Sequence, residues 1–303
     1  IRKYLKEFLS DKRVIEVNFF LWQIILNLFI LTFRPSKTAK AYKEIWMKKE
    51  NMSPLRYFTI QQAEKLNKKI GNEKIVVDYA MRHGNPSIRS VMHKLQKKGC
   101  ENLIILPLYP QYAAATTATV CDEVYRTLMQ MRWQPSLQIV PHYESEPLYI
   151  SALNQSLEKK LSEISWKPDL VIASYHGIPK KYFEKGDPYH CYCQKTSRLI
   201  IEKFNKIPIQ TTFQSRFGPQ EWLQPYTDKT LENLPKEGKK NVLVVCPGFS
   251  SDCVETLEEI AIQGKNSFFK NGGKNFDIVP CLNDDEEHIN LLKHLVDRYN
   301  LKK

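Results

Sequence analysis

The sequence contains 303 residues, of which 42% are hydrophobic and 26% are charged. This composition is close to that of an average soluble protein, which excludes an intrinsically disordered chain, a fibrous repeat and a polytopic membrane protein. Because one hydrophobic core rarely serves a chain of about 300 residues, the length favours two domains. The formal net charge of +12 is compatible with nucleic acid, an anionic membrane surface or an acidic ligand, and does not choose among them.

Seven cysteines are scattered along the chain, which is typical of free thiols in a reducing compartment rather than of a disulfide framework. We therefore expect a cytoplasmic protein. The first residues, Ile1-Arg2-Lys3, include no initiator methionine and no signal peptide, so we expect the sequence to be a fragment.

The first segment that requires interpretation is Val17 to Phe33, a run of seventeen residues without a charge. It is shorter than the roughly 20 apolar residues of a spanning helix, and polar residues such as Asn18 and Asn27 interrupt it. We interpret it as non-spanning. Two alternatives stay open: a buried core helix, or an apolar lip that rests on a membrane or contacts an apolar ligand.

From residue 74 onward, short β-branched runs alternate with amphipathic stretches, the pattern of a parallel sheet covered by helices. The predicted strands are 74–79, 102–106, 137–140, 170–174, 209–213, 242–245 and 277–279. One helix is predicted to be capped by Ser87 and to stop at Gly99, and a last helix runs from about Asp284 to Tyr299.

The strand count predicts two similar α/β units, because the first half of the chain has three predicted strands and the second half has four. We expect the boundary between the units near the proline-punctuated segment 135–147. We expect an N-terminal domain at 1–140, which carries the apolar lip, and a C-terminal domain at 141–303, whose final helix packs back on the first domain. If both units have four strands, the first lacks one, and its expected place is before Ile1.

The loops that follow the predicted strands are long and rich in glycine, proline and aromatic residues, which predicts one ligand cleft between the two units. His176 lies just past the predicted strand 170–174, in the tight turn Gly177-Ile178-Pro179. A histidine at this place faces the cleft and titrates near neutrality, so it suits proton acceptance or metal contact. A purely structural histidine is the alternative.

Four acidic residues, Asp252, Glu255, Glu258 and Glu259, follow the predicted strand 242–245 at the start of a helix. The spacing of 252, 255 and 259 places their carboxylates on one face of an α-helix. Acidic residues are common in any first helical turn, and a carboxylate ladder that guides a cation or relays protons is the functional interpretation. Spacing alone leaves both open.

Two other patterns carry little weight. His190, Cys191 and Cys193 look like part of a metal site, but a CxC motif without a second pair is a weak signal. No P-loop and no GxGxxG fingerprint occurs in the sequence, so nucleotide chemistry is unsupported.

Five motifs in chain order carry a family resemblance. They are LYPQYAAATT, SYHGIP, GDPYHCYCQKT, FQSRFGPQEWL and CPGFSSDCVETLEEI. Together with RKYLKEFLSD and RPSKTAKAYKEIW near the start, they resemble ferrochelatase in its Gram-negative bacterial form, over essentially the whole chain.

The resemblance implies insertion of Fe²⁺ into protoporphyrin IX to form protoheme, the last step of haem biosynthesis, with release of two protons. It also implies two Rossmann-like domains, each with a parallel four-stranded sheet, and a porphyrin held between them. The family's catalytic, metal-contacting histidine corresponds to His176, and the glutamate opposite it corresponds to Glu255. Glu259 and Asp252 would belong to the family's acidic path away from the site.

Metal insertion is easier when the macrocycle is held bent, so we expect a firm grip on the ring and on its propionates. The candidates are Trp22, Phe29, Tyr109, Tyr112 and Trp222 for the ring, and Arg82 and Arg216 for the propionates.

Departures from the family pattern affect the interpretation. The hydrophobic strand and NLGTP-like loop with which the family normally begins are absent, in agreement with the missing strand. Cys253 stands where some members carry histidine. The extra C-terminal cysteines that bind an iron-sulfur cluster in some members are also absent, so no cluster is expected.

Two alternatives stay open beside protoporphyrin and ferrous iron as partners. One is a chelatase for another tetrapyrrole or metal, such as coproporphyrin III with iron or a corrinoid precursor with cobalt. The other is an inactive, truncated tetrapyrrole-binding protein. We expect no nucleic-acid partner, and a cytoplasmic location with peripheral contact to the inner membrane.

Overall fold

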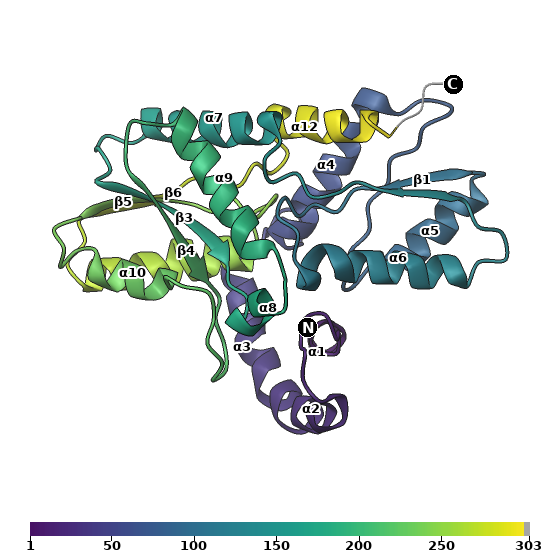
Figure 1. Cartoon of the computed structure of the whole chain (residues 1–303), viewed down its shortest axis with the longest axis horizontal. Helices are drawn as coiled ribbons and strands as arrows, with labels where there is room; N and C mark the ends of the chain where they lie inside the picture. The colour runs from purple at the N-terminus through teal and green to yellow at the C-terminus, as the bar shows by residue number, and fades with distance from the viewer. Residues whose placement is uncertain (300–303) are drawn as a thin grey trace.

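The computed structural model describes residues 1–299 and consists of two parallel β-sheets with helices packed around them (Figure 1). The strands are β1 (Asn102–Ile105), β2 (Ser136–Ile139), β3 (Leu170–His176), β4 (Ile209–Gln214), β5 (Asn241–Val245) and β6 (Asn275–Ile278). The α-helices are α1 (Arg2–Leu9), α2 (Phe19–Ile25), α3 (Leu31–Ile45), α4 (Pro54–Ile70), α5 (Ile88–Lys97), α6 (Thr119–Met129), α7 (Pro147–Glu163), α8 (Lys180–Glu184), α9 (Tyr189–Lys203), α10 (Thr227–Asn233), α11 (Lys265–Lys270) and α12 (Glu286–Asp297). Three segments are π-helical: η1 (Leu26–Ile30), η2 (Ala114–Ala118) and η3 (Glu255–Gly264).

The C-terminal sheet confirms the prediction of a four-stranded parallel sheet. Its order is β4-β3-β5-β6, and every pair is parallel. The central strand β3 reads LVIASYH and is buried from Leu170 to Tyr175, because helices cover both faces of a parallel sheet. The last strand, β6, begins two residues earlier than predicted.

The N-terminal sheet is smaller than expected. β1 pairs in parallel with β2, as predicted, but the predicted strand 74–79 is wrong, because this segment joins no ladder among residues 1–299. Its backbone donors are satisfied by side chains instead: the Val77 N–H donates to Asn67 Oδ1 and the Tyr79 N–H to Asp78 Oδ1. A run of β-branched residues forms a β-strand only where a neighbouring strand pairs with it through backbone hydrogen bonds.

Local signals placed the helix ends correctly where capping chemistry was present. Ser87 Oγ accepts a hydrogen bond of 3.2 Å from the Ser90 N–H at the start of α5. Gly99, which follows this helix, has φ +83°, a left-handed conformation that glycine adopts without steric cost.

The final helix, α12, lies against α4 of the N-terminal half (Figure 1). Leu66 of α4 packs with Ile289 and Leu292 of α12 in one hydrophobic cluster. At the edge of this contact, Lys65 forms an ion pair of 2.5 Å with Asp284. The two halves of the chain are therefore joined by an apolar contact with a polar border.

The apolar segment 17–33 forms α2 and η1 and continues into α3, so that one helical run extends from Phe19 to Ile45. By length and composition alone, this run is long enough to cross a membrane, and the length argument against spanning is therefore wrong. Its large apolar side chains are mostly exposed, up to 81% for Phe20 and 71% for Phe33, so the interpretation as a buried core helix is also wrong. We use the name apolar lip for its exposed residues Phe20, Leu21, Ile24, Leu28, Phe29 and Phe33.

Candidate active site

The site begins at the carboxyl edge of the C-terminal sheet, where β3 ends in His176 and β4 ends in Gln214, directly opposite each other in register. The imidazole of His176 is half-buried, and its Nδ1 lies 2.6 Å from the carbonyl oxygen of Gly177. Because a carbonyl can only accept, Nδ1 carries the hydrogen and the neutral ring keeps its lone pair on Nε2. The structure therefore gives His176 a free basic nitrogen.

Gly177 is required by close packing at this point. A Cβ at this position would lie 2.9 Å from the carbonyl oxygen of Gln214 and 3.2 Å from the indole of Trp222. The glycine after the histidine thus lets the turn approach β4 closely.

The acidic residues lie on the segment after β5, but their arrangement differs from the predicted α-helical face. Asp252 precedes the helix, and η3 begins at Glu255 with i→i+5 hydrogen bonding. Glu255 and Glu259, four residues apart, lie about one turn apart on η3 and therefore on nearly the same side, as they would in an α-helix. π-Helical turns are frequent at functional sites.

Glu259 is held by hydrogen bonds from the end of β4 and the residue after it. It accepts hydrogen bonds from the backbone N–H of Ser215 (2.7 Å), from the Ser215 hydroxyl, and from Gln214 Nε2 (3.4 Å). Burial raises the pKa of Glu259, while the Ser215 hydrogen bonds and the nearby His176 oppose that rise. A carboxylate of this kind exchanges protons closer to neutrality than an exposed glutamate does.

Asp252 is buried and its oxygens are occupied by hydrogen bonds. They accept from Asn283 Nδ2 (2.7 Å), Thr256 Oγ1 (3.0 Å) and the Cys281 N–H (3.4 Å). These contacts join the segment before η3 to the segment before α12.

Three tyrosines surround Glu255, and two of them escaped the sequence interpretation. Burial raises the pKa of Tyr4, Tyr42 and Tyr109, and the charge of Glu255 adds to the rise in each case. Tyr4 and Tyr42 also influence each other's pKa. Only Tyr109 follows a strand. Tyr4 and Tyr42 come from α1 and α3, and their one sequence signal was membership in the motifs RKYL and RPSKTAKAYKEIW.

Arg34 of α3 is a second residue that the sequence interpretation missed. Its guanidinium lies 5.2 Å from the centre of the Phe217 ring, and burial lowers its pKa. Within residues 1–299 it forms no ion pair with a carboxylate. A half-buried cation in this state is ready to bind an anionic group.

Arg82 and Arg216, the two arginines expected to bind propionates, already have carboxylate partners. Arg82 Nη2 lies 2.5 Å from Asp11 Oδ2, with side chains that are 12% and 7% exposed, and its Nε donates to the Thr119 carbonyl. Arg216, on the surface, pairs with Asp228 at 3.0 Å.

The aromatic candidates do not gather at one point. Trp222 is buried beside Gly177, and its indole N–H donates to the Phe217 carbonyl at 3.0 Å. Tyr112 lies near Asp187, whose charge raises the tyrosine pKa after the larger effect of burial. Trp22 packs at the base of the apolar lip and donates to the Leu9 carbonyl at 2.7 Å.

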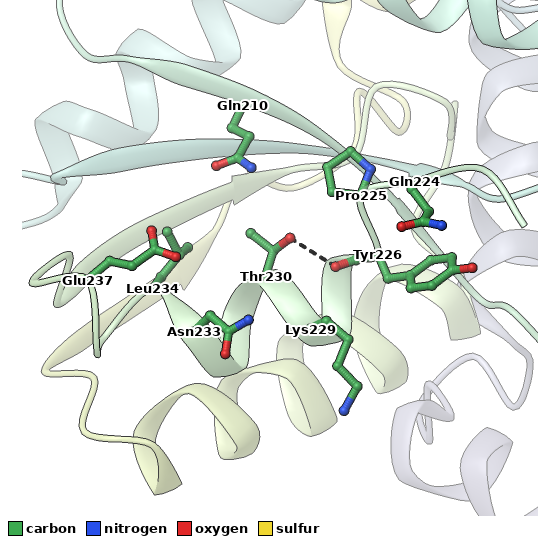
Figure 2. A pocket seen from close by; sticks show the side chains of 9 residues that line it. All are labelled: Gln210, Gln224, Pro225, Tyr226, Lys229, Thr230, Asn233, Leu234 and Glu237. Atoms are coloured by element: carbon green, nitrogen blue, oxygen red, sulfur yellow. Dashed lines mark hydrogen bonds between the residues drawn. The ribbon is translucent and has the colours of Figure 1, made fainter.

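A separate cavity of about 320 Å³ lies between β4 and α10 and contains none of the predicted site residues (Figure 2). Gln210 of β4 and Lys229, Thr230 and Asn233 of α10 are among the residues that line it. Within the described part of the chain, no group of three or more His, Cys, Asp and Glu side chains is arranged to hold a metal ion.

Chemically, the site combines a basic imidazole nitrogen at the end of β3 with two carboxylates on η3. Tyrosines lie around it, together with an arginine that has no carboxylate partner among residues 1–299. The site can accept protons and offer single nitrogen and oxygen ligands to a cation in transit. An apolar, anionic ligand suits the surrounding groups.

The comparisons with known proteins agree with this chemistry. The family model described as ferrochelatase matches residues 1–300. Proteins named ferrochelatase from Rhizobium meliloti (strain 1021) and from Francisella tularensis subsp. tularensis (strain WY96-3418) are 55% and 50% identical over 98% of this chain, which corresponds to 89% and 90% of their own lengths.

Two solved structures share the fold at low identity. SirB from Bacillus subtilis, solved with Fe³⁺, has a TM-score of 0.59 and 13% identity over 82% of this chain and 92% of its own. CbiX, described as the terminal enzyme for siroheme biosynthesis in denitrifying bacteria, has a TM-score of 0.50 and 11% identity over 87% of this chain and 94% of its own. These two likenesses show a chelatase-type fold and nothing about the substrate.

Proposed function

The chain belongs to the ferrochelatase family, and on this premise we propose that His176 and Glu255 carry its chemistry. Members of the family insert ferrous iron into protoporphyrin to form haem, and the chain is an enzyme of this activity. The reaction removes two pyrrole N–H protons while the metal enters the ring. It therefore needs a base and weak metal ligands close to the ring centre.

The observation that carries the proposal is the state of His176. Its Nδ1–H is held by the Gly177 carbonyl, so Nε2 is the free lone pair of the site. In our proposal Nε2 accepts a pyrrole proton or presents the iron, and Glu255 takes the other role. An imidazole and a carboxylate hold Fe²⁺ loosely, which suits a metal that must move on into the porphyrin.

We propose that Glu259 is the next proton acceptor on the path away from the site. Its raised pKa and its place beside Glu255 on η3 support this role. For Asp252 the hydrogen bonds from Asn283 and Thr256 favour a structural role, in which it holds the start of η3 in place.

For the porphyrin we propose Arg34 as the partner of a propionate, because it has no carboxylate of its own among residues 1–299. Tyr109 and Trp222 stay candidates for contact with the ring, and Trp22 supports the lip beside it. The ion pair with Asp11 favours a structural role for Arg82. Tyr112 is a weaker candidate for contact with the apolar porphyrin ring, because charged residues such as Asp187 and Arg13 lie near it.

The test is metal insertion under anaerobic conditions with Fe²⁺, followed through loss of the free-porphyrin spectrum. His176→Ala and Glu255→Gln should fold and bind porphyrin, and each should lower kcat by roughly 10²- to 10⁴-fold, as expected for loss of a proton-transferring group. Turnover of His176→Ala close to that of the parent would refute the assignment. The same assay with coproporphyrin III in place of protoporphyrin IX decides between the two substrates.

We propose that the domains are 1–140 and 141–303, a division supported by the two separate sheets, β1-β2 and β4-β3-β5-β6. We also propose that the enzyme works without an iron-sulfur cluster. Burial raises the pKa of the thiols of Cys246, Cys253 and Cys281, which opposes the thiolate form that a cluster needs.

We propose a cytoplasmic enzyme that touches the inner membrane through the apolar lip and has no nucleic-acid partner. Several large apolar side chains exposed on one helical run are typical of such contact. The charged residues Arg34, Lys37 and Lys40 begin directly after the uncharged part of this run, which favours a peripheral position over a spanning one. An anionic membrane and an anionic porphyrin also account for the positive net charge.

A further inference from the structure

Gln214 is a buried residue that contacts both the turn after His176 and the helix η3 that carries Glu255 and Glu259. Gln214 is the last residue of β4 and pairs in register with His176. The main-chain carbonyl oxygen of Gln214 accepts a hydrogen bond of 2.8 Å from the N–H of Gly177, the residue after His176. Its side-chain Nε2 donates to the main-chain oxygen of Glu255 at 2.7 Å and lies 3.4 Å from the carboxylate of Glu259.

The orientation of this amide is fixed by its neighbours. Nε2 faces only acceptors, namely the Glu255 carbonyl and the Glu259 carboxylate. Oε1 accepts from the Ser174 hydroxyl at 2.7 Å and lies 3.9 Å from Cys246 Sγ. The position therefore requires a side chain that donates toward η3 and accepts from the sheet, which an amide does and an ionised carboxylate cannot do.

Behind the amide, three buried hydroxyls continue the hydrogen-bonded chain. Ser174 Oγ lies 2.9 Å from Thr227 Oγ1, which lies 2.8 Å from Thr212 Oγ1. Each hydroxyl has a single proton, and Ser174 uses its own on Gln214, so Thr227 donates to Ser174 and Thr212 donates to Thr227. All four side chains belong to residues at most 3% exposed. A fully satisfied buried network of this kind is rigid, and its members strengthen one another.

We propose that Gln214 is a positioning residue, which fixes the main chain at the start of η3, and with it the carboxylates of Glu255 and Glu259, relative to His176. The inference rests on the proposed roles of His176 and Glu255. Metal insertion needs the base and the carboxylates at set places around one ring, and an offset of about 1 Å in such a site costs up to about 10²-fold in rate. Gln214 itself contacts neither the metal nor the porphyrin in this scheme.

The test is Gln214→Glu, which has nearly the same shape but loses the donor toward η3. We expect a folded protein whose kcat for iron insertion falls roughly 10- to 100-fold, the usual cost of removing a supporting hydrogen bond, with the porphyrin KM unchanged. The matched control is Gln210→Glu. Gln210 lies on the same face of β4, lines the separate cavity of Figure 2, and should leave both parameters at parental values.

Parental kcat in folded Gln214→Glu would overturn the proposal, and so would a change in KM alone. If circular dichroism shows that this variant is unfolded, Thr227→Val takes its place. Thr227→Val removes, at nearly constant volume, the hydroxyl that links Ser174 to Thr212, and its kcat must also fall with KM unchanged. His176→Ala is assayed in parallel. Loss of turnover in His176→Ala with parental kcat in Gln214→Glu rejects only the positioning role, whereas full turnover in His176→Ala rejects the proposed function itself.

Discussion

The guanidinium of Arg34 lies over the face of Phe217, 5.2 Å from the ring centre, and pairs with no carboxylate among residues 1–299. The two residues come from opposite halves of the chain, one from α3 and the other from the loop after β4. Burial lowers the pKa of Arg34, so its charge is partly desolvated before any ligand binds. A propionate that reaches this cation would gain a charge-assisted hydrogen bond.

Arg34→Gln should therefore raise the KM for protoporphyrin roughly 10- to 100-fold, corresponding to about 1.5–3 kcal/mol for a hydrogen bond to a charged group. The same variant should use the dimethyl ester of protoporphyrin as well as the parent does, because the ester has no carboxylate to lose. Arg216→Gln is the control, since Arg216 already pairs with Asp228. An equal loss with free acid and ester would contradict the propionate role.

The hydroxyl of Ser215 should influence the pH dependence of the enzyme through Glu259. The residue has φ +66°, so Ser215→Gly removes the hydroxyl without backbone strain. Because the hydroxyl stabilises the carboxylate form, its loss should raise the pKa of Glu259 further. The acid limb of the kcat/KM profile should then move to higher pH by up to about one unit. An acid limb at the parental position would show that Glu259 does not titrate in the rate-limiting step.

The apolar lip should bind membranes through its most exposed phenylalanines. Replacing Phe20 and Phe33 by serine together should weaken binding to phosphatidylglycerol vesicles at least roughly tenfold, since each buried phenylalanine contributes about 1.5–3 kcal/mol. Vesicle flotation measures the effect. Met129→Ser is the control, because Met129 is as exposed as Phe20 but lies on α6, away from the lip. Equal binding of the double variant and the parent would rule out contact through the lip.

His288 should make the protein sensitive to acid. Burial in α12 lowers its pKa to about 4, against 6.5 for an ordinary histidine. As the pH falls below 6.5, the unfolded chain takes up this proton before the folded one does, so stability is lost between pH 6.5 and about 4. In the parent, the free energy of unfolding should be lower at pH 4.5 than at neutral pH, and urea unfolding measures this difference. His288→Gln should make the difference smaller by about 2–3 kcal/mol.

The comparison for this last experiment is His294→Gln, because the His294 side chain lies on the same helix but is 43% exposed. If both variants lose stability with pH as steeply as the parent, another group causes the acid sensitivity.

The sequence determined those features that depend on local pattern. Alternating apolar runs predicted six of the six observed strands, and the cap at Ser87 and the glycine at 99 placed a helix to within a residue. His176 could be proposed from its place in a loop directly after a predicted strand, whereas Glu255 was singled out among the acidic residues only by the family resemblance. The family, too, followed from motifs that are each continuous in sequence.

What only the tertiary structure decided involves groups brought together from distant segments. The run 74–79 has strand composition but no ladder, and the segment 17–33 has core composition but is exposed, because pairing and burial depend on neighbours that the run itself does not encode. Tyr4, Tyr42 and Arg34 reach the site from helices that precede both sheets. Arg82 and Gln214 also have partners tens of residues away, as Asp252 has in Asn283 and Cys281. These distant partners decide whether a side chain is free to act or is held in a structural hydrogen bond.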